Sequence, residues 1–114
     1  MRRGLRILVL AMVMAGLVAG AASAVTFINI ATGSTGGAYY PLGAAMAKIW
    51  NDNIEGIKAS AQSTGGTVNN IQLMGSGEAE TGFMDGLYYY AYLGKDKFEG
   101  NPQDYIRALV PLYP

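Results

Sequence analysis

The stretch Ile30-Ala31-Thr32-Gly33-Ser34-Thr35-Gly36-Gly37-Ala38-Tyr39-Tyr40-Pro41-Leu42-Gly43 joins a predicted strand to a predicted helix. The residues just before it, Phe27-Ile28-Asn29-Ile30, are branched or aromatic in the main, which is typical of a buried strand. Pro41 presets a helical φ angle, so we expect it as the first or second residue of the helix. Apolar residues then recur at the spacing of one helix face: Leu42, Ala45, Met46, Ile49 and Trp50.

The joint itself is Ser34-Thr35-Gly36-Gly37. Hydroxyls and glycines at this point leave main-chain N–H groups free to face a ligand, next to the positive end of a helix dipole. The sequence therefore predicts that this joint holds an anionic group.

The first 24 residues have the pattern of a secretory signal peptide. Met1-Arg2-Arg3-Gly4-Leu5-Arg6 is basic, residues 7–19 are apolar, and Ala22-Ser23-Ala24 provides the small residues of a cleavage site. A transmembrane anchor is the alternative, but the apolar run is shorter than the roughly 20 residues that span a bilayer. We therefore expect cleavage after Ala24 and a periplasmic location for residues 25–114.

Composition argues against several classes of function. Removing residues 1–24 leaves 90 residues, and because that segment carries three arginines and no acid, the net charge changes from 0 to −3. A mildly acidic chain without a basic patch is a poor candidate for nucleic-acid binding. The chain has no cysteine and no histidine, and its acidic residues are scattered, so we expect neither a metal nor a cofactor.

A second strand–helix unit repeats the first. Ile57-Lys58-Ala59-Ser60-Ala61 alternates like a half-exposed or edge strand, and Ser63-Thr64-Gly65-Gly66 repeats the four residues of the first joint before a predicted helix over residues 67–74. Two βα units with identical joints predict a parallel sheet whose loops meet at the carboxyl ends of the strands, where α/β sheets bind ligands. The alternative is that each joint only caps a helix and permits a tight turn.

A third unit follows. Glu80-Thr81-Gly82-Phe83-Met84 is a weak strand candidate, Asp85-Gly86 is a turn, and residues 87–93 form a predicted helix. Asp85 either contacts an amine of the ligand or stabilises the turn. The helix carries four tyrosines, namely Tyr88, Tyr89, Tyr90 and Tyr92. We expect each of them in the core or in an interface, and the alternative is that they place a ring or a phenol in a cleft.

The remaining residues are predicted as a solvated loop and a further strand. Residues 94–102 are mainly polar, and Arg107-Ala108-Leu109-Val110-Pro111-Leu112-Tyr113 has the composition of a strand that Pro111 breaks. The sequence stops at Pro114 without a closing helix. We therefore expect residues 25–114 to be an incomplete α/β lobe, the amino-terminal part of a longer protein.

Residues 26–114 resemble the start of the solute-binding subunit of a tripartite (TRAP) transporter of the TAXI family. The resemblance rests on four runs in the same order: residues 30–43, residues 58–70 (KASAQSTGGTVNN), Tyr89-Tyr90-Ala91-Tyr92 and Leu112-Tyr113-Pro114. It implies a type II periplasmic-binding-protein-like fold with two lobes. Such receptors close on an amino acid such as glutamate or glutamine, or on an organic acid, and pass it to the membrane subunits of a permease.

The resemblance also implies which residues contact the ligand. The first edge of the cleft would consist of Ser34, Thr35, Gly36, Gly37 and Tyr39, and the second edge of Ser63, Thr64, Gly65, Gly66 and Asn69. Many relatives have an Asn-Asp pair where this chain has Met84-Asp85-Gly86, a departure that concerns ligand identity. The second lobe is also missing, and because half a cleft leaves one side of a ligand in water, we expect weak binding or none.

Other functions remain as alternatives. An enzyme would need a Ser-Thr-Gly-Gly joint to act as a phosphate cradle or as a serine nucleophile, but neither joint has the lysine of a Walker loop. The available bases would be Lys48, Lys58, Lys95 and Lys97, none of them close to either serine in sequence. We therefore expect no enzyme. A small exported α/β interaction domain that docks through its tyrosine-rich helix, or a non-functional fragment, is the other possibility.

Overall fold

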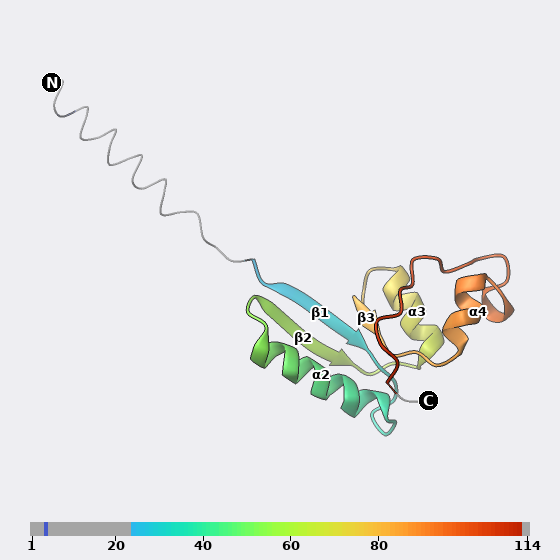
Figure 1. The fold of residues 1–114 in the computed structure, drawn as a ribbon, viewed down its shortest axis with the longest axis horizontal. Coiled ribbons are helices and arrows are strands. Elements are labelled where there is room, and N and C mark those ends of the chain that lie inside the picture. The colour runs from blue at the N-terminus through green and yellow to red at the C-terminus, as the bar shows by residue number, and fades with distance from the viewer. Residues whose placement is uncertain (1–3, 5–23, 113–114) are drawn as a thin grey trace.

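The computed structural model describes residue 4 and residues 24–112. In chain order its elements are β1 (Thr26–Ala31), α2 (Tyr39–Asn53), β2 (Ile57–Gln62), α3 (Thr67–Gly75), β3 (Thr81–Gly82), α4 (Leu87–Leu93) and the 3-10 helix η1 (Asp96–Phe98) (Figure 1). Except for Gly4 and Ala24, the predicted signal peptide lies outside the described residues.

The strands form one parallel sheet in the order β2-β1-β3. β1 pairs along its whole length with β2. β3 contributes only Thr81 and Gly82, which pair with Ile30 and Ala31, so this strand is shorter than predicted. The arrangement confirms an α/β lobe built from βα units around a parallel sheet, with α2 on one side of the sheet and α3 and α4 grouped together (Figure 1).

Helix α2 packs on the sheet through a contact that only glycine allows. A Cβ atom added at Gly43 would lie 2.4 Å from Cγ2 of Thr32. The buried face of α2 therefore centres on Gly43 and Ala47. Around this contact, Ile30, Ala47 and Phe83 form a buried cluster, and the partly buried hydrophobic side chains packed against it are Ile28, Tyr39, Met46, Trp50 and Ala59.

The predicted apolar face of α2 is wrong in part. Met46 and Trp50 pack as expected, but Leu42, Ala45 and Ile49 are exposed. The cause is the close approach at Gly43, which turns the side of the helix with the smallest residues toward the sheet. The helix also begins two residues before Pro41, which is therefore its third residue rather than its first or second.

β1 is less buried than the sequence predicted. Ile30 is fully buried, whereas Phe27 is 73% exposed. β3 pairs only with the last two residues of β1, so the amino-terminal half of β1 has a neighbouring strand on one side only. The prediction of a uniformly buried strand is wrong for this half.

A second buried cluster joins α3, α4 and the segments after them. It consists of Ile71, Ala91, Phe98 and Ile106, with Val68 and Met84 packed against it. The polar segment 94–102 therefore contributes a core residue, Phe98, through η1, and the prediction of a wholly solvated loop is wrong. The strand predicted from Arg107 onward does not form, since residues 106–112 adopt neither helix nor strand and Tyr113 lies outside the described residues.

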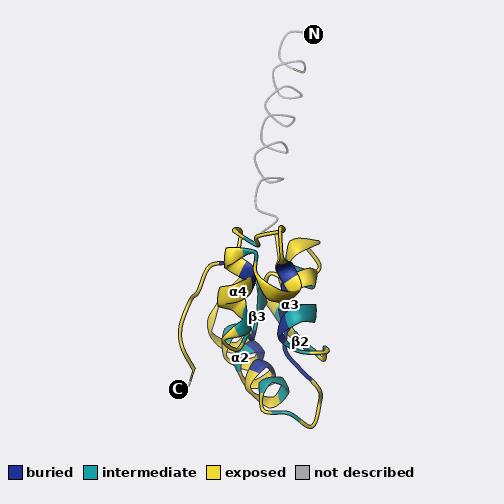
Figure 2. Ribbon diagram, turned by 90° about the vertical axis from the view of Figure 1, so that its right-hand side faces the viewer, coloured by how far each residue is buried: buried dark blue, intermediate teal, exposed yellow. Residues whose placement is uncertain are grey.

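The four tyrosines of α4 do not lie in the core. Tyr88, Tyr89, Tyr90 and Tyr92 are all exposed, while the buried residue of this helix is Ala91. Accordingly, most of the α4 ribbon has the colour of exposed residues (Figure 2). This helix has seven residues and one buried position, and none of the four tyrosines occupies it. Of the two environments predicted for these tyrosines, packing in the core is excluded.

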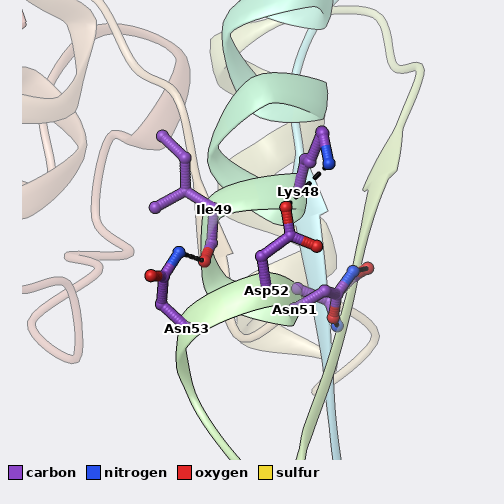
Figure 3. Close-up of polar contacts among 6 residues, drawn as sticks. Lys48, Ile49, Asn51, Asp52 and Asn53 are labelled. Carbon is purple, nitrogen blue, oxygen red and sulfur yellow. Dashed lines mark hydrogen bonds and ion pairs between the residues drawn. The ribbon is translucent and has the colours of Figure 1, made fainter.

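β2 is an edge strand, as its alternating sequence predicted, and α2 covers part of its open edge. The side-chain amide of Asn51 donates to the carbonyl of Ala59 at 2.8 Å and accepts from its N–H at 2.7 Å. The neighbouring Asn53 bonds only the carbonyl of Ile49 within the helix, and Lys48 pairs with Asp52 at 2.7 Å (Figure 3). Asn51 thus imitates a strand partner at an edge that would otherwise present unpaired main-chain groups.

Candidate functional site

The three strand–helix joints meet at the carboxyl edge of the sheet. The N–H of Thr64 donates to the carbonyl of Gly33 at 3.1 Å, and the hydroxyl of Ser63 donates to the same carbonyl at 3.0 Å. The third joint, Met84-Asp85-Gly86 between β3 and α4, adjoins the second, because the N–H of Asp85 donates to the hydroxyl oxygen of Thr67 at 3.1 Å. The predicted site residues are therefore neighbours in space, as two adjacent βα units require.

The first joint presents hydrogen-bond donors that have no partner among residues 24–112. These are the hydroxyls of Ser34 and Thr35 and the N–H groups of Thr35, Gly36, Ala38 and Tyr40. Ser34 accepts one bond through its carbonyl, from Gly37 at 2.9 Å. No side chain caps the start of α2, so of the alternative roles only the tight turn, closed by the bond from Gly37 to Ser34, is present in this joint. The free donors lie at the positive end of the α2 dipole.

The second joint has the same sequence but uses its hydroxyls internally. The hydroxyl of Thr64 donates to Oδ1 of Asn70 at 2.6 Å and accepts from the N–H of Gly66 at 3.1 Å. The N–H of Gly65 donates to Oδ1 of Asn69 at 3.2 Å. The N–H groups of Thr67, Val68 and Asn69, in the first turn of α3, have no partner within the described part of the chain.

Asn70 holds the joints together, and the sequence analysis missed it. Its side chain is fully buried, and its amide nitrogen donates to the carbonyls of Thr32 and Phe83, each at 2.7 Å. These bonds tie the ends of β1 and β3 to the start of α3. A signal was available, because Thr67, Asn70 and Ile71 share the i, i+3, i+4 spacing of the buried face of α3.

Tyr39 belongs as much to the core as to the edge. Its ring stacks on that of Phe83, with the ring centroids 5.5 Å apart, and it is half-buried in the cluster under α2. The stack joins the first joint to the third. Tyr39 thus stands at the predicted edge with one ring face already occupied.

Asp85 does stabilise the turn, which was one of its two predicted roles. Its Oδ1 accepts the N–H of Leu87 at 3.0 Å at the start of α4. The side chain is exposed, and Oδ2 has no partner among the described residues. The carboxylate therefore keeps an acceptor available beside the first turn of α3.

The four glycines of the joints differ in what the backbone demands of them. Gly66 has a φ of +94°, which L-residues rarely adopt, so glycine is needed there for the turn. Gly36 has an ordinary φ, and a Cβ atom added to it would meet nothing within 4 Å. Gly37 is more confined, with Oγ of Ser34 at 3.3 Å from the position of its missing Cβ. Neither turn geometry nor packing explains the glycine at position 36.

In a comparison with known families, residues 30–114 match the NMT1-like family. The matched range includes the first and second joints. The chain belongs to the NMT1-like family. This is a periplasmic-binding-protein-like family, and membership agrees with the parallel α/β sheet.

The NMT1-like assignment gives this chain a solute-binding function in general terms. Binding proteins of this type are typically extracellular or periplasmic. In the part of the chain that the structure describes, no helix is long and apolar enough to cross a membrane.

Proposed function

We propose that this NMT1-like chain forms one side of the binding cleft in a TAXI-type receptor of a tripartite transporter, and that the cleft takes a small carboxylate-bearing solute. Membership of the family supports solute binding in general. One observation carries the finer proposal: the first joint collects hydroxyl and main-chain donors without partners among the described residues, at the start of α2.

A carboxylate suits this set of groups. The free groups are N–H and O–H donors, and a carboxylate only accepts hydrogen bonds. Hydrogen bonds to a charged acceptor contribute about 1.5–3 kcal/mol each, and a helix N-terminus adds about 0.3–1 kcal/mol. No lysine or arginine occurs in residues 30–43, 62–70 or 83–87. The anion would therefore be held by dipoles rather than by an ion pair.

The same edge favours a solute that also carries an ammonium group. The exposed carboxylate of Asp85 lies beside the start of α3, and its Oδ2 can accept a hydrogen bond from a positively charged ammonium group. An α-amino acid such as glutamate would place its α-carboxylate on the first joint and its ammonium on Asp85. The remaining ligand-lining residues of the proposal are Ser34, Thr35, Gly36, Gly37, Tyr39, Ser63, Thr64, Gly65, Gly66 and Asn69.

The proposed mechanism is capture and release, with no covalent step. Two lobes would close about their hinges on the solute and pass it to the membrane subunits of the permease. We propose no catalytic role, because the hydroxyl of Ser63 donates to a main-chain carbonyl and no lysine bonds either serine among residues 24–112. Activation of a serine nucleophile requires a base within hydrogen-bonding distance.

Amide-resolved NMR of the full chain tests the proposal, because it detects weak binding. We expect L-glutamate to shift the N–H resonances of Gly36, Gly37 and Ala38. Glutarate, which lacks only the α-amino group, should shift the same resonances with lower affinity. Asp85→Asn keeps the acceptor that caps Leu87 and should lower the affinity for glutamate but not for glutarate.

A matched pair of serine variants completes the test. Ser34→Ala removes a free hydroxyl of the first joint and should weaken binding of both ligands. Ser76→Ala removes a hydroxyl that bonds Leu73 at the far end of α3 and should leave binding unchanged. If the shifts caused by glutamate and glutarate are unchanged by Ser34→Ala, or spare the glycine amides while other residues shift, the first joint is not the carboxylate site.

A further inference from the structure

We propose that a second binding site, separate from the joints, lies on the outer side of α4 and takes an aromatic carboxylate. The site is a hollow of about 350 Å³ lined by Tyr88, Tyr89, Tyr92, Ile106, Arg107 and Ala108. This volume is at the lower end of the range of ligand pockets, about 300–1,000 Å³, and is sufficient for one ring with a short acidic side chain.

Arg107 supplies the charge of this site. Its Nη1 donates to the carbonyl of Asp104 at 2.5 Å and to that of Ile106 at 2.9 Å. These two bonds occupy both protons of Nη1 and hold the guanidinium in place. Nε and Nη2 have no partner among the described residues, and they form the edge of a guanidinium that binds a carboxylate through two parallel bonds.

No acidic side chain neutralises Arg107 within residues 24–112. The one ion pair in this part of the chain joins Lys48 to Asp52, on α2. Among these residues, Arg107 therefore remains available to pair with an anionic ligand.

Three tyrosines supply the aromatic surface. Tyr88, Tyr89 and Tyr92 line the hollow with exposed rings, and their hydroxyls form no hydrogen bond among the described residues. Exposed rings arranged around one concavity favour a flat aromatic ligand, which can stack on a ring face or meet it edge-on. The free hydroxyls can bond a polar substituent on that ligand.

The wall opposite α4 is anchored. Ile106 is buried against Ile71, Ala91 and Phe98, and the N–H of Gln103 donates to the carbonyl of Ala91 at 2.8 Å. These contacts fix the segment that carries Arg107 relative to α4. The ring surface and the cation therefore keep their spacing in the absence of a ligand, which reduces the ordering cost of binding.

The probe for this site is phenylacetate, titrated into the full chain and followed through the ring resonances of ¹³C-labelled tyrosines. We expect shifts at Tyr88, Tyr89 and Tyr92. Cyclohexylacetate has the same charge without the aromatic ring, and benzyl alcohol has the ring without the charge. Each should bind about tenfold more weakly than phenylacetate, a difference that corresponds to about 1.4 kcal/mol.

Variants assign the contacts. Arg107→Gln should weaken phenylacetate binding about tenfold and remove its preference over benzyl alcohol, while Lys97→Gln, an exposed cation of η1 outside the hollow, should change nothing. Tyr92→Phe keeps the ring and should retain binding, whereas Tyr92→Leu should lose it.

Several results would overturn the proposal. Equal affinity for phenylacetate and cyclohexylacetate would show a charge site without aromatic selectivity. Shifts at Gly36 and Ala38 in place of the tyrosines would assign the acid to the joints. Sedimentation would show a protein interface instead if the chain self-associates, if Tyr88→Ala and Tyr92→Ala abolish the self-association, and if phenylacetate causes no shifts at the tyrosines.

Discussion

The hydroxyl of Thr64 donates a 2.6 Å hydrogen bond to Oδ1 of Asn70, a buried side chain that in turn bonds the ends of β1 and β3. The equivalent hydroxyl of the first joint, that of Thr35, has no partner among the described residues. Two identical tetrapeptides therefore have different tasks in one fold. The second joint secures the edge of the sheet, and the first leaves its donors available to a ligand.

The glycines of the joints provide the sharpest test of this division. Gly36→Ala should leave the free energy of unfolding within about 0.5 kcal/mol, because φ is ordinary and the added methyl group meets nothing within 4 Å. The methyl group should nevertheless obstruct a ligand that approaches the main chain, and thus weaken the glutamate shifts. Urea unfolding followed by the fluorescence of Trp50, the chain's single tryptophan, measures the stability.

Gly66→Ala is the matched control for that variant. Its φ of +94° strains any L-residue, so we expect a loss of about 1–2 kcal/mol in the same urea experiment. If Gly36→Ala were as destabilising as Gly66→Ala, the glycine of the first joint would have a structural explanation and the argument for ligand approach would fail.

Among residues 24–112, Asn70 should be the polar position most sensitive to substitution. Asn70→Ala removes two donated bonds and one accepted bond from a fully buried site, and each buried group left without a partner costs about 1–3 kcal/mol. We expect a loss of at least about 3 kcal/mol, a large part of the stability of a small domain. Asn69→Ala, at the neighbouring half-buried position, removes one 3.2 Å bond to Gly65 and should cost less than about 1 kcal/mol. Equal losses at the two positions would contradict this account.

Local patterns in the sequence predicted much of the fold. Alternation predicted β2 as a half-exposed or edge strand, and the repeated joint placed two helices after two parallel strands. Those features depend on residues near each other in the chain. The buried face of α2 was predicted wrongly in part, because it depends on a contact between Gly43 and Thr32, which lie eleven residues apart.

The missed residues have the same origin. Phe98 looked solvated because its neighbours in sequence are charged, yet it packs on Ile71 and Ala91, which come from α3 and α4. Asn70 looked like a polar residue on a helix surface, and only the approach of β1 and β3 gives its amide two carbonyls. The convergence of the predicted site residues could be read from the repeat, but the difference between the two joints could not, since their four residues are identical.

The amide of Asn51 should stabilise the open edge of β2. Asn51→Ala removes both bonds to Ala59, and we expect a loss of about 1–2 kcal/mol in urea unfolding. Asn53→Ala, two residues along the same helix, removes only a bond within the helix and should cost about 0.5 kcal/mol or less. Asn51→Ala should also aggregate more readily than the unmodified chain, because it exposes the edge of β2, and light scattering measures this tendency. Identical behaviour of the two variants would show that water replaces the Asn51 amide at the edge.

Gly94 ends α4 and should tolerate no side chain. Its φ is +64°, and a Cβ atom would lie 2.9 Å from the nitrogen of Pro102. Gly94→Ala should therefore destabilise the chain by about 2 kcal/mol or more, since it combines strain with a clash against the main chain. Gly100 has a similar φ of +73°, but a Cβ atom added there would meet nothing within 4 Å. Gly100→Ala should therefore lose only the free energy of backbone strain, about 1 kcal/mol. Thermal unfolding followed by circular dichroism would rank the two variants, and a reversed order would contradict the proposed clash.

Tyr105 should make the fold sensitive to alkaline pH. Its hydroxyl donates to the carbonyl of Ile71 at 2.7 Å and would lie 2.6 Å from a Cβ at Gly75, and partial burial raises its pKa above 10.0. The folded chain therefore favours the protonated phenol. Its contribution is fully present below the pKa of the unfolded state and decreases as pH rises through the folded pKa, because the unfolded chain releases its proton first.

A comparison with Tyr105→Phe isolates this effect from the other tyrosines. The variant retains the ring but has no proton to lose, so the stability difference between the two chains should shrink from about pH 9 to about pH 11. Urea unfolding at several pH values in this interval measures it. A difference that stays constant across the interval would mean that the phenol of Tyr105 has the same pKa in the folded and unfolded states, and that burial does not favour its protonated form.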